Sequence, residues 1–291
     1  MSQVYLNGEY MLLENAKISV LDRGFVFGDG VYEVVPCYGG KAFRLKEHLQ
    51  RLEASLHGIK LENPLKPHEW AHIFSTLIAT ETAADLSIYL QITRGVAPRD
   101  HAFPTDVSPT VFVMIKPLPP LDAKSLQEGV AAITLDDIRW RYCHLKTIAL
   151  LPNILLRQQA LESGATEAIL VREGYLTEGT ASNIFVVCQG KILTPPKGPF
   201  LLPGITRDLV LELAHSHQIP AFEEPISLAQ LNSAEEVWLT SSTKEVLAIT
   251  RLDGRPVGNA TPGPLWDKMY KILQTYKDLL KIKPHSTLGA S

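Results

Sequence analysis

The sequence predicts an α+β protein of two domains. Its 291 residues are enough for one large domain or two modest ones. Segments with strand and helix patterns do not alternate strictly, which argues against a doubly wound parallel sheet. Three prolines lie within residues 117–120, where neither a central strand nor a helix can continue. We therefore expect an N-terminal α+β domain over residues 1–116, a linker over 117–124 and a C-terminal domain over 125–291.

The N-terminal domain is expected to begin with a hairpin. Val4–Leu6 and Glu9–Leu13 flank Asn7-Gly8, a pair typical of a type I′ turn. The segments that follow show helical spacing of apolar residues or are rich in Ile, Val, Phe and Tyr. They predict helices at Arg44–His57 and Pro67–Thr80 and strands at Leu86–Arg94 and Thr110–Lys116.

The C-terminal domain is expected to mix strands and helices in the same way. The predicted strands are Val130–Leu135, Glu167–Val171, Asn183–Cys188, Glu236–Thr240 and Glu245–Thr250. The predicted helices are Leu151–Ser163, Thr206–His217 and Pro264–Leu280.

Composition narrows the class of function. A hydrophobic content of 45% with 20% charged residues is typical of a globular enzyme, and a net charge of −3 without a basic stripe argues against nucleic acid as a partner. No apolar run approaches the ~18 residues of a membrane span, and the N-terminus lacks a secretory signal pattern, so a cytoplasmic protein is expected. The three cysteines are widely spaced and predict neither disulfides nor a metal site.

Two residues about thirty positions apart suggest a covalent cofactor. Lys146 borders the apolar segment Ile148–Leu151, and a partly buried lysine loses its proton more readily, which favours a Schiff base with an aldehyde. Glu178 lies in a turn of small residues before a strand, where it can face a cationic ring nitrogen. Pyridoxal 5′-phosphate (PLP) requires such a pair. From its neighbours alone, an ordinary surface lysine is the more common explanation of Lys146.

Three further segments suit a phosphate group. Gly204-Ile205-Thr206 opens a predicted helix, whose free N–H groups attract anions. Ser241-Ser242 lies at the end of an apolar strand, and Arg51 lies on a predicted helix beside its leucine face. Taken singly, each has a simpler interpretation, respectively a plain helix cap, an ordinary loop and a solvated arginine.

In combination, these segments resemble the class IV (fold type IV) PLP enzymes, which include D-amino-acid and branched-chain aminotransferases and aminodeoxychorismate lyases. The similarity extends from Tyr5 to the final helix, and its motifs keep a common order and spacing. The matching segments are Asp22–Glu33, His48 with Arg51-Leu52, Lys146, Glu178-Gly179 with Ser182-Asn183, Gly204–Arg207 and Ser241-Ser242.

The resemblance implies a smaller N-terminal α/β sandwich and a larger C-terminal pseudo-barrel, with PLP between them in a homodimer. It implies that Lys146 forms the Schiff base and that Glu178 holds the pyridine nitrogen. Leu202 would pack against the cofactor ring. The phosphate would be held by Arg51, Ile205, Thr206, Ser241 and Ser242.

One loop points to a member of the family. Arg99 and His101 lie two positions apart in a loop after a predicted strand, and together they can bind one carboxylate, although a solvated loop with a basic tip has the same composition. The loop resembles the carboxylate trap of D-amino-acid aminotransferases. That resemblance implies that Arg99 and His101 reach the partner subunit's site, where a tyrosine at the position of Tyr32 completes the trap.

The sequence therefore predicts PLP-dependent transamination between a D-amino acid of the D-alanine type and a 2-oxo acid such as 2-oxoglutarate or pyruvate. The alternatives are a branched-chain L-aminotransferase or aminodeoxychorismate lyase of the same fold, against which the Arg99–Pro104 loop argues, and a non-catalytic relative. Pro36-Cys37 departs from the family pattern. Proline cannot donate a hydrogen bond to a neighbouring strand, so this departure suggests a change in the wall of the pocket.

Overall fold

A computed structural model describes residues 2–282 of the chain. The chain divides into two compact units at Pro119/Pro120, inside the predicted linker. Residues 145–149 and 279–282 belong to the first unit, whereas the sequence places them in the second domain. The predicted C-terminal domain also extends over residues 283–291, which lie outside the described part. The domain boundaries drawn from the sequence therefore stay a prediction.

The first unit is built on a six-stranded antiparallel sheet with the order β2-β1-β6-β5-β3-β4. The hairpin at its edge turns at Asn7 and Gly8, whose φ angles of 49° and 100° are those of the predicted type I′ turn. Pairing between β3 and β5 continues through Pro36, so the proline does not interrupt the sheet. The strands are β1 Gln3–Leu6, β2 Glu9–Leu12, β3 Gly30–Tyr38, β4 Lys41–Ala42, β5 Asp85–Thr93 and β6 Thr110–Pro117.

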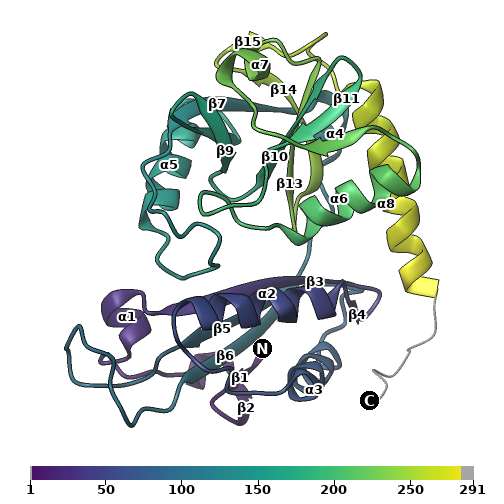
Figure 1. The fold of residues 1–291 in the computed structure, drawn as a ribbon. Helices are drawn as coiled ribbons and strands as arrows, with labels where there is room; N and C mark the ends of the chain where they lie inside the picture. The colour runs from purple at the N-terminus through teal and green to yellow at the C-terminus, as the bar shows by residue number, and fades with distance from the viewer. Residues whose placement is uncertain (1, 283–291) are drawn as a thin grey trace. The chain divides into compact units, whose positions relative to one another are not determined.

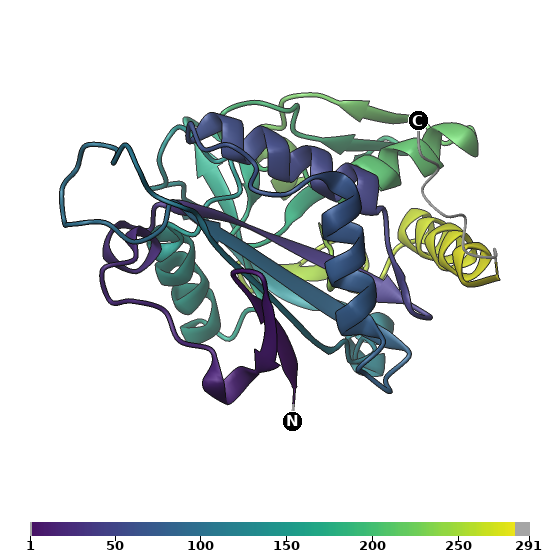
Figure 2. The same cartoon turned by 90° about the horizontal axis from the view of Figure 1, so that it is seen from below.

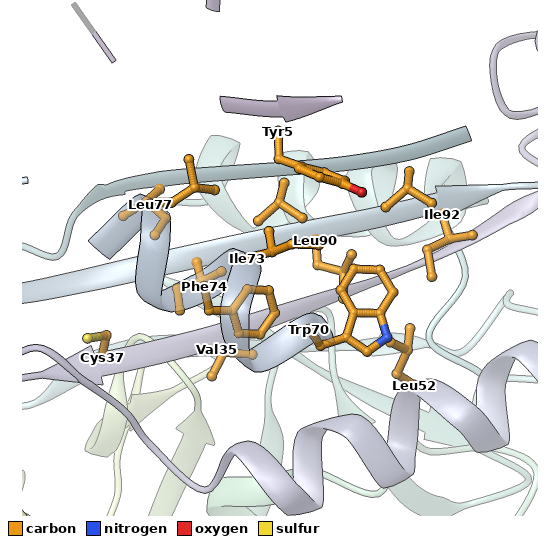
Figure 3. Close-up of a cluster of buried hydrophobic side chains, with 14 of the residues drawn as sticks. Tyr5, Val35, Cys37, Leu52, Trp70, Ile73, Phe74, Leu77, Leu90 and Ile92 are labelled. Carbon is orange, nitrogen blue, oxygen red and sulfur yellow. The ribbon is translucent and has the colours of Figure 1, made fainter. Parts of the chain in front are cut away.

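Two helices of the first unit pack on one face of this sheet, as Figures 1 and 2 show. Alternate residues of β3, β5 and β6 meet the apolar sides of α2 and α3, because successive side chains of a strand point to opposite faces. Trp70 and Phe74 of α3 fill the layer against Leu52 of α2, and all three are buried (Figure 3). The helical segments are the 3-10 turn Leu13–Asn15, α1 Arg23–Phe27, α2 Leu45–Gly58 and α3 Pro67–Ile78.

The second unit contains a nine-stranded mixed sheet with the order β12-β11-β10-β13-β14-β7-β8-β9, and β15 pairs with β14. Residues from β7 to β11, β13 and β14 meet in a single apolar cluster around Ile184, Leu239 and Ile249. A flat sheet of this width cannot bring strands from both ends to one cluster, so the sheet must curl, in agreement with the predicted pseudo-barrel. The strands are β7 Val130–Asp136, β8 Glu167–Arg172, β9 Tyr175–Gly179, β10 Asn183–Cys188, β11 Lys191–Thr194, β12 Ala221–Glu223, β13 Glu236–Ser241, β14 Glu245–Leu252 and β15 Arg255–Pro256.

Five helices accompany this sheet (Figure 1). Strands β7 and β8 are parallel, so the chain must cross back over the sheet between them. Helix α5 forms this crossover connection. The three long helices agree with the sequence prediction to within two residues at each end. Their bounds are α4 Ala123–Glu128, α5 Leu151–Glu162, α6 Ile205–Ser216, α7 Leu228–Asn232 and α8 Pro264–Ile282.

Three findings bear on the composition-based expectations. No helix in residues 2–282 is long and apolar enough to cross a membrane. Over the same residues, no group of three or more His, Cys, Asp or Glu side chains is arranged to hold a metal ion. The thiols of Cys37, Cys143 and Cys188 are free.

The core of the first unit makes a stability prediction. Phe74→Ala removes a ring that is 1% exposed and leaves a cavity between α3 and the sheet. We expect the free energy of unfolding to fall by about 3–5 kcal/mol. Leu13→Ala, at a position that is 48% exposed, is the control and should change it by less than about 0.5 kcal/mol. If the two substitutions lower the free energy of unfolding equally, as measured with urea, this placement of the core is wrong.

Candidate active site

Lys146 lies on a short segment that pairs with strand β3. The backbone N–H of Tyr32 donates to the carbonyl of Lys146 at 3.0 Å, and the N–H of Ile148 donates to the carbonyl of Gly30 at 3.1 Å. Residues 145–149 thus continue the antiparallel pattern of the first unit's sheet, although they follow β7 in the chain. This pairing places the predicted reactive lysine beside Tyr32.

The side chain of Lys146 is half-buried and faces an aromatic ring. Its Nζ lies 4.1 Å from the ring centroid of Tyr32, and its backbone N–H donates to Ser55 Oγ on α2 at 3.1 Å. Gly58, the last residue of α2, allows this close approach, because a Cβ atom there would collide with the side chain of Leu145. Contacts with both β3 and α2 therefore fix the segment that carries Lys146.

A buried carboxylate, Glu33 on β3, organises the adjacent face of α2. Arg51 donates to it twice, from Nε to Oε1 at 2.7 Å and from NH2 to Oε2 at 2.8 Å. His48 Nδ1 lies 2.8 Å from the same Oε2. The sequence predicts Arg51 as a phosphate ligand, and the structure adds that a carboxylate fixes the orientation of its guanidinium group. Glu33 ends the matching segment Asp22–Glu33, but the sequence alone does not indicate this role.

The protonation of this cluster follows from its geometry. Burial alone would raise the pKa of Glu33, but Arg51 and His48 hold it well below the usual range. Burial lowers the pKa of His48 despite the opposing influence of Glu33. An ionised carboxylate can only accept hydrogen bonds, so a neutral His48 must carry its hydrogen on Nδ1 and donate it to Glu33.

Glu178 is the central carboxylate of the second unit. The structure places it in strand β9, rather than in the turn that the sequence suggests, and leaves it 5% exposed. Its Oε2 accepts from the backbone N–H of Leu202 at 2.9 Å and from Asn183 Nδ2 at 3.3 Å. Asn183 also donates to the carbonyl of Leu202 at 2.9 Å, so the predicted ring-packing residue is fixed to the same carboxylate.

Arg139 is a further residue of this site, to which the sequence analysis assigned no function. Its NH1 pairs with Glu178, while its Nε and NH2 each donate to Asp137 at 2.9 Å. Burial raises the pKa of Glu178 to about 7, with Arg139 opposing the shift. Burial acts to lower the pKa of Arg139, but Asp137 and Glu178 reverse this and raise it. A carboxyl group that titrates near neutrality beside a permanent cation suits proton-linked binding of a ring nitrogen.

The beginning of α6 fits an anion. Its N-cap is Gly204, and the helix begins at Ile205, one residue before the predicted start at Thr206. No side chain caps the helix, so the first N–H groups remain available. A Cβ atom at Gly204 would collide with Asn183 Oδ1, and Asn183 pairs in register with Thr240 of β13. The buried Thr240 Oγ1 has no hydrogen-bond partner within residues 2–282. Free N–H groups and an unpaired hydroxyl beside one another are the donors that phosphate oxygens require.

The two predicted serines lie at the end of the same strand. Ser241 is the last residue of β13, and its Oγ accepts from the backbone N–H of Lys244 at 3.1 Å. Ser242 follows immediately and is half-buried. Thr240 precedes these serines in a run of four hydroxyl residues, 240–243, but the run alone does not show which of its members points inward.

Arg99 and His101 lie together in the loop between β5 and β6. The Cζ of Arg99 is 5.3 Å from the ring centroid of Phe27, and the His101 ring centroid lies 5.4 Å from the same point. Both side chains are exposed. The structure thus gathers the two basic residues around one aromatic ring of α1, whereas Tyr32 lies on β3 against Lys146.

Similarity to known proteins identifies the family of the chain. Residues 30–252 match the model of the family described as amino-transferase class IV. The chain belongs to this family. It is 39% identical to a D-alanine aminotransferase of Bacillus licheniformis over 94% of this chain and 96% of that protein. It is 38% identical to a D-alanine aminotransferase of Staphylococcus epidermidis over 95% and 98% of the two chains.

Solved structures support the same assignment. The aminotransferase is similar to the branched-chain amino acid aminotransferase of Escherichia coli, with a TM-score of 0.88 and 26% identity over 99% of this chain and 97% of that one. A second branched-chain amino acid aminotransferase, determined with pyridoxamine 5′-phosphate, gives a TM-score of 0.89 at 26% identity, covering 95% and 94% of the two chains. The predicted fold type IV architecture, the enzyme class and the PLP cofactor are confirmed.

The Glu33 cluster makes a pH prediction. Because the pKa of Glu33 is lowered on folding, its contribution to stability is complete above the ordinary value of 4.5 and is lost as the pH falls below it. Glu33→Gln should destabilise the protein by about 3–5 kcal/mol near neutral pH, since Arg51 loses its buried counter-charge. The difference from wild type should shrink below pH 4.5. Urea unfolding of both proteins at a series of pH values measures this difference in stability. A difference that does not change with pH would contradict the lowered pKa of Glu33.

Proposed function

We propose that this aminotransferase transfers the amino group of a D-amino acid of the D-alanine type to a 2-oxo acid such as 2-oxoglutarate or pyruvate. The observation that carries the proposal is that Arg99 and His101 both lie beside the ring of Phe27, where their N–H groups can donate to one carboxylate. The relatives that are 36–39% identical over nearly the whole chain are D-alanine aminotransferases.

Lys146 is proposed as the catalytic residue. PLP supplies an aldehyde that links to a lysine amine and an electron-withdrawing ring that stabilises negative charge at the substrate Cα. The amine of Lys146 holds the cofactor in the resting enzyme and, once released, moves the Cα proton as base and then acid. The neighbouring Tyr32 ring, 4.1 Å from Nζ, limits where the amine can move.

The other cofactor contacts are proposed by chemical role. Glu178, supported by Arg139 and Asn183, takes the pyridine nitrogen, and Leu202 packs against the ring. The phosphate is assigned to Arg51 and to four further residues. Those four are Ile205, Thr206, Ser241 and Ser242.

Two features of the second unit support the binding of PLP, and neither is needed to stabilise the fold. The uncapped N-terminus of α6 and the unpaired Thr240 hydroxyl lie beside one another and supply donors for a phosphate. The Glu178 carboxyl, with a pKa of about 7, can match the protonation of a ring nitrogen.

We also propose a cytoplasmic homodimer in which Arg99 and His101 serve the partner subunit's site, with Tyr32 completing the carboxylate trap there. Large apolar side chains are exposed on each unit, including Phe25 at 71% and Leu151 at 65%. Exposed apolar side chains of this size would be covered by a second copy in a dimer. Free thiols fit a reducing compartment.

Other activities of the same fold are less well supported. A branched-chain L-aminotransferase is suggested by structural neighbours at 26% identity, well below the 38–39% of the D-alanine enzymes. Neither a branched-chain L-aminotransferase nor an aminodeoxychorismate lyase is expected to carry the Arg99–Pro104 loop. A non-catalytic relative would not need both Lys146 and the supported Glu178.

The role of Lys146 can be tested covalently. Wild-type enzyme reduced with borohydride should carry the cofactor on the peptide that contains Lys146, as seen by mass spectrometry. Lys146→Ala should lose both this adduct and turnover, whereas Lys124→Ala, on the exposed surface of α4, should keep both. A Lys146→Ala variant that still turns over through an adduct elsewhere would contradict the assignment.

The carboxylate trap can be tested at Arg99. Arg99→Ala removes a charge-assisted contact. The apparent KM for D-alanine should rise by a factor that corresponds to a loss of about 2–4 kcal/mol of binding free energy. Asp106→Ala alters an exposed residue of the same loop and should leave the KM unchanged. An unchanged KM in Arg99→Ala would remove Arg99 from the trap.

A further inference from the structure

The loop that carries Arg99 and His101 needs support from outside itself. It spans residues 94–109 between β5 and β6 and contains no helix or strand of its own. A loop of this length has many accessible conformations, so its ordering carries an entropic cost. Both basic side chains are exposed and cannot be fixed by burial. Contacts to the loop backbone must therefore set their position.

Arg23 provides such contacts directly beside His101. Its NH1 donates to the carbonyl of Asp100 at 2.6 Å and to the carbonyl of Ala102 at 3.2 Å. These two carbonyls flank His101 on either side, and the first one directly follows Arg99. The Arg23 side chain is buried, with 5% exposed. One buried guanidinium group thus holds the backbone at the centre of the carboxylate-binding loop.

The guanidinium group is itself held on the other side. Arg23 Nε donates to Asp29 Oδ2 at 2.8 Å, and Arg94 donates to the same carboxylate from Nε at 2.8 Å and from NH2 at 3.1 Å. Burial acts to raise the pKa of Asp29, but Arg94 and Arg23 lower it, so the carboxylate stays charged. The backbone N–H of Arg23 also donates to the carbonyl of Gly95 at 2.8 Å. Arg23 is therefore a rigid link between Asp29 and the loop.

Phe27 extends this link to the side chains of the loop. Its ring centroid lies 4.8 Å from Arg23 Cζ and 5.3 Å from Arg99 Cζ, on the helix that begins with Arg23. Asp22 caps that helix through Gly24 N at 2.8 Å. The backbone contacts and the aromatic contact thus come from one short, capped element.

We propose that Arg23 is a positioning residue for the substrate carboxylate: it orders the loop so that Arg99 and His101 present their donors together. This inference rests on the proposed D-amino-acid aminotransferase function, because it assumes that these two residues bind the carboxylate. Arg23 does not touch the substrate. It acts by raising the fraction of enzyme in which the trap is assembled.

Loss of that ordering has a defined kinetic signature. An apparent affinity falls in proportion to the fraction of competent molecules, so Arg23→Gln should raise the KM for D-alanine by roughly tenfold or more while kcat at saturation changes less than about twofold. If Arg23 acts through the trap, the same substitution should have little further effect on KM when Arg99 and His101 are both alanine.

The experiment is a double-mutant cycle on the holoenzyme with D-alanine and 2-oxoglutarate, with thermal unfolding of every variant. Lys41→Gln, which removes a cation from the carbonyls of Leu280 and Lys281 in the same unit, is the matched control and should keep the wild-type KM. If Arg23→Gln fails to fold, Arg23→Lys takes its place. It keeps the charge but not the planar fork, and should show the same direction of change.

The outcomes separate the inference from the function on which it rests. Strong non-additivity, with KM raised and kcat retained, supports the inference. A wild-type KM in Arg23→Gln, or an equal rise in KM with and without the trap residues, overturns it even when Arg99→Ala raises the KM as proposed. A wild-type KM in Arg99→Ala instead overturns the carboxylate trap, and the inference falls with it.

Discussion

The pairing of residues 145–149 with strand β3 is the constraint on which the position of Lys146 depends. These residues follow β7 in the chain, yet they hydrogen-bond to Tyr32 and Gly30 of the N-terminal sheet. A lysine on a free linker would sample many positions. Here its backbone is fixed on both sides, by β3 and by Ser55 of α2, so the amine of Lys146 has a defined location against the Tyr32 ring.

The same physical solution recurs at three carboxylates. Glu33 holds Arg51, Glu178 is held by Arg139, and Asp29 holds Arg23. A buried charge without a partner would be strongly destabilising, so each pair must form on folding. The planar guanidinium group then has one fixed orientation. In the proposed enzyme, the three arginines serve respectively the phosphate, the ring nitrogen and the substrate carboxylate, so the charges that stabilise the fold also order the site.

Much of the fold was accessible from the sequence, because periodicity and turn chemistry are local. Asn7-Gly8 predicted its hairpin, and the leucine spacing predicted α2. The partners were not accessible. The role of Arg139 depends on its contacts with Asp137 and Glu178, and Glu178 lies on β9, a strand that the sequence does not predict. The start of α6 at Ile205, with Gly204 as N-cap, likewise depends on packing against Asn183.

The most direct test of the account is stereochemical. Initial rates measured with D-alanine and with L-alanine or L-leucine, each with 2-oxoglutarate as amino acceptor, compare the proposed function with its nearest rival in one assay. The account predicts rapid formation of D-glutamate from D-alanine and little turnover of either L-amino acid. Rapid turnover of L-leucine with none of D-alanine would contradict it.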